Sequence, residues 1–226
     1  MRFRLRGAEP SPRDTEFARP MPDADYLKPY RKAQAAYGVD FDVTLWASET
    51  TQRKRFEVFR DMLFLRGKTL LDAGCSRADF AAFLLEHGVE YGKYVGVDGI
   101  EEVLAYARDR KLPRAEYYHG DLVTGPALLT IGPPEVTVIS GTLNTMKLGA
   151  ATKLLDKAWA GCTQTLAFNF LSDRCDPRAP RQAYPARRLP AMKLFDWALR
   201  KTWDVRYRQD YFPMGHDATI VMHKHA

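Results

Sequence analysis

The feature that most constrains the fold is the alternation of strand-like and helical segments from residue 69 onward. Short apolar runs, several rich in β-branched or aromatic residues, predict strands at 69–74, 94–99, 115–121, 136–141 and 165–172. Between them, apolar residues at helical spacing predict helices at 79–88, 101–111 and 149–160. This alternation is typical of a parallel sheet with helices on both faces. The first run, "TLLDAG", is almost entirely apolar, as expected of a strand buried on both faces.

The C-terminal part predicts a different ending for the sheet. After a helix at 191–201, two strand-like runs, "WDVRYRQDYF" and "ATIVMHKH", are separated only by "PMGHD", which favours a hairpin. The predicted fold is therefore α/β: a Rossmann-like, doubly wound, mostly parallel sheet with an antiparallel C-terminal hairpin. Segment 173–190 holds four prolines and five arginines, so we expect a long loop. It is either a solvated surface or a lid that meets an anionic substrate.

The chain length of 226 residues fits one domain with an N-terminal addition. We expect residues 1–45 to be an extension, partly helical or disordered and loose up to about residue 20, and residues 46–226 to form the domain. A helix at 48–65 begins at Ser48, a good N-cap. No stretch has the eighteen or more apolar residues of a membrane span, and the N-terminus lacks the apolar core of a secretory signal, so a cytoplasmic protein is expected.

Cysteine usage and charge limit the possible partners. Cys75, Cys162 and Cys175 are widely spaced and odd in number, which favours reduced thiols over disulfides or zinc ligands. His223 and His225 lack an evident third ligand, so no metal site is predicted. The formal charge of +6 allows an anionic partner, but the arginines are spread along the chain, which makes nucleic acid a weak prediction.

Polar or glycine-containing positions follow four successive predicted strands. Asp72 with Gly74 ends the first strand and Asp98 the second, while Asp121 follows the third and Ser140-Gly141 the fourth. An open α/β sheet binds its ligand at the carboxyl ends of its strands. Asp98 could accept hydrogen bonds from both ribose hydroxyls, and Asp121 could accept one from an exocyclic amino group such as that of adenine. The four strand ends together predict a nucleoside pocket.

The runs "LLDAGCSRADF", "VGVDGI", "HGDL" and "SGTLN", in this order, resemble class I S-adenosylmethionine (SAM)-dependent methyltransferases. The flanking segments "WASETTQRKRFEVF" and "AFNFLSDRCD…QDYFPMGHDATIVMHK" are similar to a group of bacterial methyltransferase-like proteins of poorly defined substrate. The resemblance covers roughly residues 45–225. It implies a seven-stranded sheet with SAM as cofactor and S-adenosylhomocysteine (SAH) as product.

The resemblance also implies roles for individual residues. Asp72, Gly74 and Cys75 would line the methionine part of the cofactor, and Asp98 would hold the ribose. Gly99 and Ile100 would flank the adenine, whose edge Asp121 and Leu122 would recognise. Ser140 and Gly141 would face the sulfonium. The segment that carries Trp46, Gln52 and Arg55 would close over the sulfonium region. An arginine there could pair with the methionine carboxylate. From the residues alone, Cys75 next to a helix start could be a reactive thiol of low pKa, but a small turn residue is favoured. Trp46 is equally compatible with simple packing, and Arg55 with a solvated charge.

The glycine turn departs from the pattern of the resembling proteins. These usually read Gly-Cys-Gly-x-Gly-Asp-Phe, whereas Ser76 and Ala78 replace two of the glycines here. Because both side chains are small, we expect the approach of a ligand to be narrowed and not blocked, provided that neither position needs a positive φ.

The acceptor side is less defined by the sequence. Asn144, Asn169, Asp210, Tyr211 and His216 could border an acceptor pocket, and His216 or Asp210 could serve as a base if the acceptor must lose a proton. We expect a small-molecule acceptor. Two alternatives remain open at this point: an NAD-dependent oxidoreductase, although Gly-x-Gly-x-x-Gly spacing is lacking, and a SAM-binding or RNA-binding module without turnover.

Overall fold

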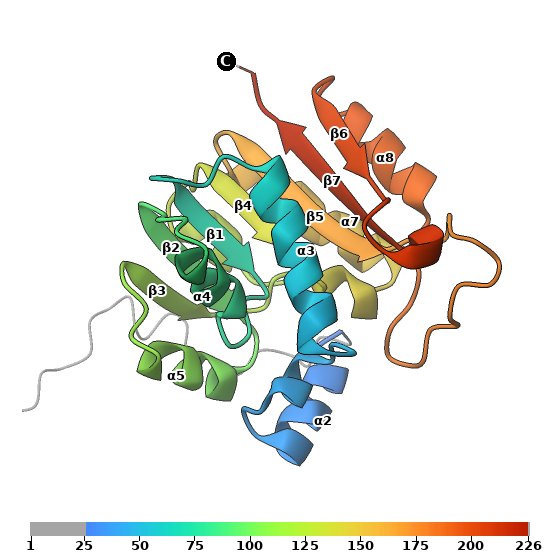
Figure 1. Cartoon of the computed structure of the whole chain (residues 1–226). Coiled ribbons are helices and arrows are strands. Elements are labelled where there is room, and N and C mark those ends of the chain that lie inside the picture. Colours follow the sequence, from blue (N-terminus) through green and yellow to red (C-terminus); the bar gives the residue numbers. More distant parts are fainter. Residues whose placement is uncertain (1–25, 226) are drawn as a thin grey trace, which may run out of the picture.

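A seven-stranded mixed sheet forms the centre of the molecule (Figure 1), and its order is β3-β2-β1-β4-β5-β7-β6. The computed structural model describes residues 26–225. The strands are β1 (Thr69–Ala73), β2 (Lys93–Asp98), β3 (Ala115–His119), β4 (Val136–Ile139), β5 (Thr165–Leu171), β6 (Val205–Arg208) and β7 (Asp217–His223). The first five strands pair in parallel, whereas β7 runs antiparallel between β5 and β6. The predicted fold class is therefore confirmed, including the antiparallel C-terminal hairpin.

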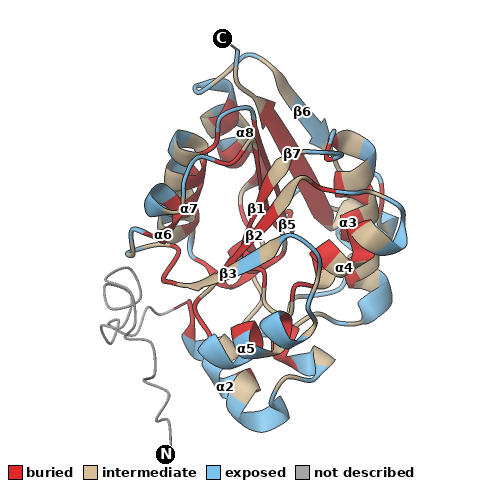
Figure 2. Ribbon diagram, turned by 90° about the vertical axis from the view of Figure 1, so that its left-hand side faces the viewer, coloured by how far each residue is buried: buried red, intermediate tan, exposed pale blue. Residues whose placement is uncertain are grey.

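Helices cover both faces of the sheet (Figure 2). On one face lie α3 (Glu49–Met62) and α4 (Asp79–Glu86), and on the other lie α6 (Ala127–Thr130), α7 (Leu148–Gly161) and α8 (Ala191–Leu199). Helix α5 (Glu101–Asp109) contributes to both layers, since Val103 and Leu104 pack into different core clusters. Two apolar cores, one on each face, thus hold the strands that carry the candidate site.

The layer formed by α3 and α4 is rich in aromatic rings. Phe56 of α3 lies 5.0 Å from Phe80 and 5.6 Å from Phe83 of α4, measured between ring centroids. Ser48 caps α3, and its hydroxyl accepts a hydrogen bond from the Thr51 N–H. The ring contacts fix α3 against α4. The start of α3, near Ser48, is thereby held close to the carboxyl ends of the parallel strands, where Trp46 and Thr51 line the cavity described below.

The segment before α3 also folds against the sheet. Helix α2 (Lys28–Tyr37) and a 3-10 turn (Phe41–Thr44) lie beyond the carboxyl ends of the parallel strands (Figure 1). Tyr26, Leu27 and Val43 belong to the apolar core beside Ile100 and Leu122. None of the helices within residues 26–225 combines the length and apolar character needed to cross a membrane. The expected looseness of residues 1 to about 20 lies outside the described residues.

Candidate functional site

A cavity of about 700 Å³ opens at the carboxyl ends of β1, β2 and β4. This volume is within the range of small-molecule and cofactor sites. Strand ends contribute Gly74, Asp98 and Ser140; the N-terminal segment and the loop at residues 180–186 enclose the opposite side. Among the residues expected at a site, the cavity wall contains Gly74, Asp98, Gly99, Ile100, Leu122, Ser140, Gly141, Asn144, Trp46, Arg55 and His216.

The turn from β1 into α4 is a left-handed turn. Gly74 has φ +90°, and a Cβ there would lie 2.1 Å from Thr142 Oγ1. The Thr142 side chain therefore leaves no room for any residue other than glycine at this position. The N–H groups of Gly74 and Cys75 both donate to the Val97 carbonyl, at 2.8 and 3.1 Å. The turn is thus fixed to β2.

Ser76 and Ala78 do adopt positive φ, at 45° and 58°. The expectation that these replacements narrow the approach of a ligand without blocking it required that neither position has a positive φ, and this condition is not met. A left-handed conformation costs an L-residue with a side chain about 1–2 kcal/mol. Ala78, which is fully buried, lies at the N-cap of α4. The altered turn keeps the shape of a glycine turn at the expense of local strain.

Asp98 is the acidic group best placed to meet a ligand. Its two carboxylate oxygens accept hydrogen bonds from the backbone N–H groups of Ser76, at 2.9 Å, and Ile100, at 3.0 Å. Burial raises the pKa of Asp98 to about 6, and the backbone N–H groups oppose the rise. Near neutral pH the carboxylate is therefore mostly ionised and presents only acceptors to the cavity.

Asp121 does not line the cavity, in contrast to the expectation that it recognises an adenine amino group. Its carboxylate is fully buried and accepts hydrogen bonds from the N–H groups of Val123 and Thr124, at 2.7 and 3.0 Å. The Tyr26 hydroxyl donates to the same carboxylate at 3.2 Å and accepts from the Leu122 N–H at 2.9 Å. An N-terminal side chain thus uses the groups that were expected to read the base edge.

The end of β4 is covered by the Trp46 ring. A Cβ on Gly141 would lie 2.3 Å from the Trp46 ring, so the indole rests directly on this backbone. The Asn169 side chain accepts from the Gly141 N–H at 2.8 Å and donates to the Ser140 hydroxyl at 3.1 Å. Asn169 is fully buried, so it supports the β4 end from beneath and does not border the cavity itself.

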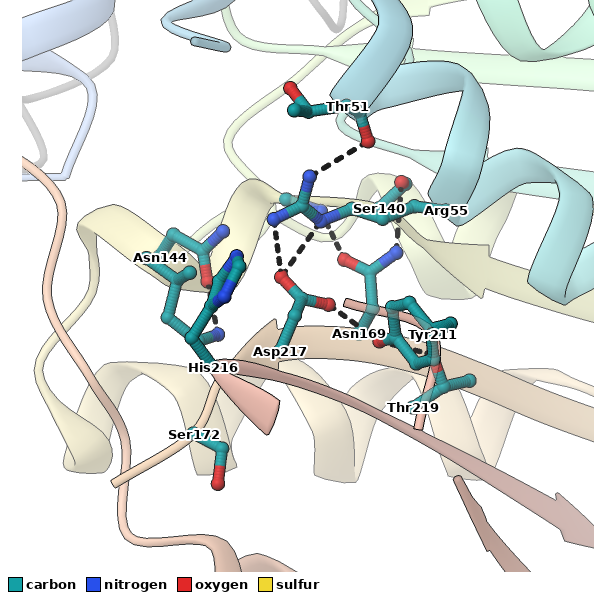
Figure 3. Close-up of polar contacts among 12 residues, drawn as sticks. Thr51, Arg55, Ser140, Asn144, Asn169, Ser172, Tyr211, His216, Asp217 and Thr219 are labelled. Atoms are coloured by element: carbon teal, nitrogen blue, oxygen red, sulfur yellow. Dashed lines mark hydrogen bonds and ion pairs between the residues drawn. The ribbon is translucent and has the colours of Figure 1, made fainter. Parts of the chain in front are cut away.

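Arg55 is held by the protein and not left free for a ligand carboxylate (Figure 3). Its Nε and Nη2 donate to Asp217 Oδ2, at 2.7 and 2.5 Å, and its Nη1 donates to the Thr51 carbonyl at 2.8 Å. The guanidinium lies between two rings, 4.4 Å from Trp46 and 4.6 Å from Phe212. Because Asp217 is fully buried and Arg55 nearly so, the ion pair locks α3 to β7.

Three further expected cofactor residues are buried in or beside the layer of α3 and α4. Asp72 accepts a hydrogen bond of 2.6 Å from the buried Tyr94 hydroxyl, and burial raises the pKa of Asp72 to about 7. Burial likewise raises the pKa of the Cys75 thiol well above its usual value, which makes it unreactive and leaves the small-turn-residue interpretation. Gln52, also buried, donates to Asp79 at 3.5 Å. None of these three side chains is part of the cavity wall.

Of the two candidate bases, only His216 lies in the cavity wall. Its ring stacks on Phe212 at a centroid distance of 4.9 Å, and its Nδ1 lies 3.1 Å from the Pro213 carbonyl. Asp210 is exposed and pairs with Arg208 at 2.8 Å, and that contact lowers the pKa of Asp210. Asn144 lines the cavity, whereas the Tyr211 hydroxyl is directed to Asp217 and Thr219. Within residues 26–225, no cluster of three potential metal ligands is found.

Sequence reasoning missed the contribution of the N-terminal segment. Tyr26, Leu27, Tyr30 and Thr44 all line the cavity, although they lie in what was expected to be an extension. A signal was present: Tyr26, Tyr30, Ala33 and Tyr37 recur at intervals of four, three and four residues, which places them on one helical face.

Comparisons with known proteins give matches only at the level of structure. Neither the protein-family models nor the curated proteins contain a match to the sequence. Magnesium protoporphyrin IX methyltransferase (ChlM) from Synechocystis PCC 6803 with bound SAM aligns over 90% of this chain and 99% of its own, with a TM-score of 0.65 and 11% identity.

Other solved structures align similarly. The methyltransferase domain of bacterial CtHen1 aligns over 78% of this chain and 100% of its own, with a TM-score of 0.55 and 15% identity. The pyocyanin biosynthetic protein PhzM aligns over 89% of this chain and 69% of its own, with a TM-score of 0.57 and 16% identity. At these identities the similarity is one of fold.

Proposed function

Because the chain has the fold of class I SAM-dependent methyltransferases, we propose that it transfers the methyl group of SAM to a nucleophile on a small-molecule acceptor, leaving SAH. The observation that carries this proposal is the Asp98 carboxylate at the end of β2, oriented toward the cavity by the Ser76 and Ile100 N–H groups. A carboxylate fixed in this way suits two neighbouring ribose hydroxyls. Solved neighbours of the same fold carry SAM or SAH, which supports this choice of ligand.

The cavity provides for the other parts of such a ligand. Ile100 and Leu122 supply apolar contacts for a base, while Gly74 and Ser76 bring the turn after β1 into the wall. Trp46 closes the end of β4, where Ser140 and Gly141 would meet the reacting part of the cofactor. SAM supplies an electrophilic methyl group on a positively charged sulfur. Catalysis by this chain would therefore depend mainly on alignment of the acceptor.

His216 is the proposed general base, needed where the methyl acceptor loses a proton during the transfer. If Nδ1 carries the hydrogen and donates to the Pro213 carbonyl, Nε2 is left with a lone pair that can accept a proton. Stacking on Phe212 restricts the orientation of the imidazole. Asp210 is not proposed for this role, because it lies on the surface in an ion pair with Arg208.

An anionic small molecule is the proposed acceptor class. The cavity is closed on one side by residues 180–186, and Arg181 is the arginine of the 173–190 loop that belongs to its wall. Arg178 pairs with Asp176, and Arg188 donates to the carbonyls of Ser172 and His216, so these two are engaged in holding the loop. The structural neighbours named for a protoporphyrin and for pyocyanin biosynthesis support a small-molecule acceptor.

Calorimetric titration with SAM, SAH and NAD tests the proposal. We expect heat with both adenosyl ligands. Asp98→Asn should weaken SAH binding by about tenfold to a hundredfold, because hydrogen bonds to a charged group contribute about 1.5–3 kcal/mol. Asp109→Asn, at an exposed position on α5, removes the same charge away from the cavity and should leave affinity unchanged. Absence of heat with both SAM and SAH, or a higher affinity for NAD than for these two ligands, would contradict the proposal.

A further inference from the structure

The Tyr26 hydroxyl makes two hydrogen bonds at the base end of the cavity. It donates to Asp121 Oδ1 at 3.2 Å and accepts from the Leu122 N–H at 2.9 Å. The tyrosine ring is 6% exposed and packs in the same core as Ile100 and Leu122. Burial and the neighbouring Asp121 raise the pKa of Tyr26 far above its usual value, so the phenol stays protonated and remains a donor.

This pair of contacts has the same chemistry as the edge of an adenine base. An adenine presents an amino donor beside a ring-nitrogen acceptor, and a carboxylate next to a backbone N–H is complementary to that pair. A phenol hydroxyl satisfies the same two groups with a single oxygen, because it donates and accepts. While Tyr26 is bound, Asp121 and the Leu122 N–H are engaged with a residue of the chain itself.

We call the region formed by Asp121, Leu122, Gly99 and Ile100 the base subsite. Leu27 covers the wall of this subsite next to Gly99. Two atoms of its side chain lie 2.7 and 2.8 Å from the position that a Cβ on Gly99 would take, and Leu27 is 4% exposed. Gly99 precedes Ile100, which lines the cavity beside Asp98. Two consecutive residues therefore occupy both the polar edge and an apolar wall of the base subsite.

The helix that follows these two residues buries little of its own surface. Along α2, Ala33 is the buried residue, and no side-chain hydrogen bond caps the N-terminus of the helix. Tyr30 packs against the core and hydrogen-bonds to the Thr145 side chain. Helices with few buried contacts open at low free energy. Displacing the segment therefore requires breaking the contacts of Tyr26 and Leu27 together with those of Tyr30.

We propose that Tyr26 and Leu27 form a displaceable plug of the base subsite, which the adenosyl cofactor must expel in order to bind. This inference rests on the proposed function and adds a control on it. The plug lowers the apparent affinity for cofactor in proportion to the fraction of molecules in which the subsite is closed. The segment at residues 26–38 therefore moves outward when the cofactor binds.

Calorimetry with SAH on the full-length chain tests the plug through the sign of a mutational effect. Tyr26→Phe keeps the ring but removes the hydroxyl, and Leu27→Ala removes the contact with Gly99, so both destabilise the closed state. We expect Tyr26→Phe to bind SAH about fivefold to tenfold more tightly than the unmodified chain, and Leu27→Ala also to bind more tightly. Tyr207→Phe, which removes a hydroxyl from edge strand β6, should not change the affinity.

Hydrogen exchange provides a second readout. Saturating SAH should accelerate amide exchange in residues 26–38, because these residues leave the sheet. Equal or weaker SAH binding by Tyr26→Phe, or slower exchange in this segment, would overturn the plug and leave the proposed function intact. If neither the unmodified chain nor Tyr26→Phe binds SAH while both are folded, the proposed function fails and the plug with it.

Discussion

The strain in the turn after β1 predicts that restoring glycine stabilises the protein. Ser76 has φ 45° and is half-buried, and it contacts Asp98 through its backbone N–H. Replacement by glycine relieves about 1–2 kcal/mol of left-handed strain, while the greater freedom of glycine in the unfolded chain removes about 0.4–1 kcal/mol. Ser76→Gly should therefore raise the free energy of unfolding by about 1 kcal/mol.

For Ala78 the backbone strain and the freedom of glycine in the unfolded chain also oppose each other, and the burial of its methyl group must be added. Its φ of 58° carries similar strain, but its methyl group is fully buried. Loss of that methyl group costs about 0.8 kcal/mol. We therefore expect Ala78→Gly to leave stability nearly unchanged, and the double variant to resemble Ser76→Gly. The two positions differ in outcome because only one of them has a packed side chain to lose.

Urea unfolding followed by circular dichroism measures these differences in the free energy of unfolding. The variants should share the same dependence of this free energy on urea concentration. Ala82→Gly is the matched control, since Ala82 lies within α4 and has ordinary helical geometry. That variant should lower the free energy of unfolding by about 0.5–1 kcal/mol. If Ser76→Gly destabilises the protein as much as Ala82→Gly does, the turn is not strained and the reasoning is refuted.

Three further predictions concern buried groups around the site. Because burial raises the folded-state pKa of Asp72 from 3.8 to about 7, its contribution to stability falls as pH rises from about 4 to about 7. Asp72→Asn should therefore raise the free energy of unfolding at pH about 8, by up to about 4 kcal/mol, and have little effect near pH 4. Melting temperatures measured at both pH values check this, and an equal increase at both would contradict it. Asp217→Ala leaves Arg55 buried without its partner and should lower the urea-unfolding free energy by about 3–5 kcal/mol, much of it regained in the double variant with Arg55→Met. Gly141→Ala places a methyl group against the Trp46 ring and should weaken SAH binding in calorimetry; unchanged affinity would separate this ring from the cofactor site.

The sheet could be predicted from the sequence because its signals are local. Each strand is a short apolar run closed by turn residues, and the Pro213–Asp217 separation fits a hairpin. Strand β6 ends earlier than expected, at Arg208, because the Gln209 side chain binds the Gly215 carbonyl and draws the chain into the following turn. Differences of this kind depend on side-chain contacts and not on periodicity.

The side-chain directions at the strand ends were harder to predict. Asp72 and Asp98 are both aspartates near the end of a buried strand, yet one faces Tyr94 beneath α3 and α4 and the other faces the cavity. Alternation along the strands does not separate them, because Leu70 of β1 and Tyr94 of β2 both pack on the α3 and α4 side, which places Asp72 and Asp98 on that same side. They differ in position along the strand: Asp98 is the last residue of β2, whereas Asp72 precedes the last residue of β1.

Long-range partners account for the remaining differences. Arg55 pairs with Asp217 across 162 residues, and Tyr26 binds Asp121 across 95 residues, so neither pair leaves a local pattern in the sequence. An arginine beside a predicted cofactor site is equally compatible with a ligand carboxylate and with a buried aspartate. Only the packing of β7 between β5 and β6 brings Asp217 beneath α3 and decides between them.

A crystal structure of the full-length chain with SAH tests the central claim most directly. The account predicts that the ribose hydroxyls lie within hydrogen-bonding distance of the Asp98 carboxylate, with the base between Ile100 and Leu122. The sulfur should lie beside Gly141, on the side of the cavity that His216 borders. A nucleoside bound elsewhere, or a cavity that excludes SAH at saturating concentration, would contradict the assignment of this site to methyl transfer.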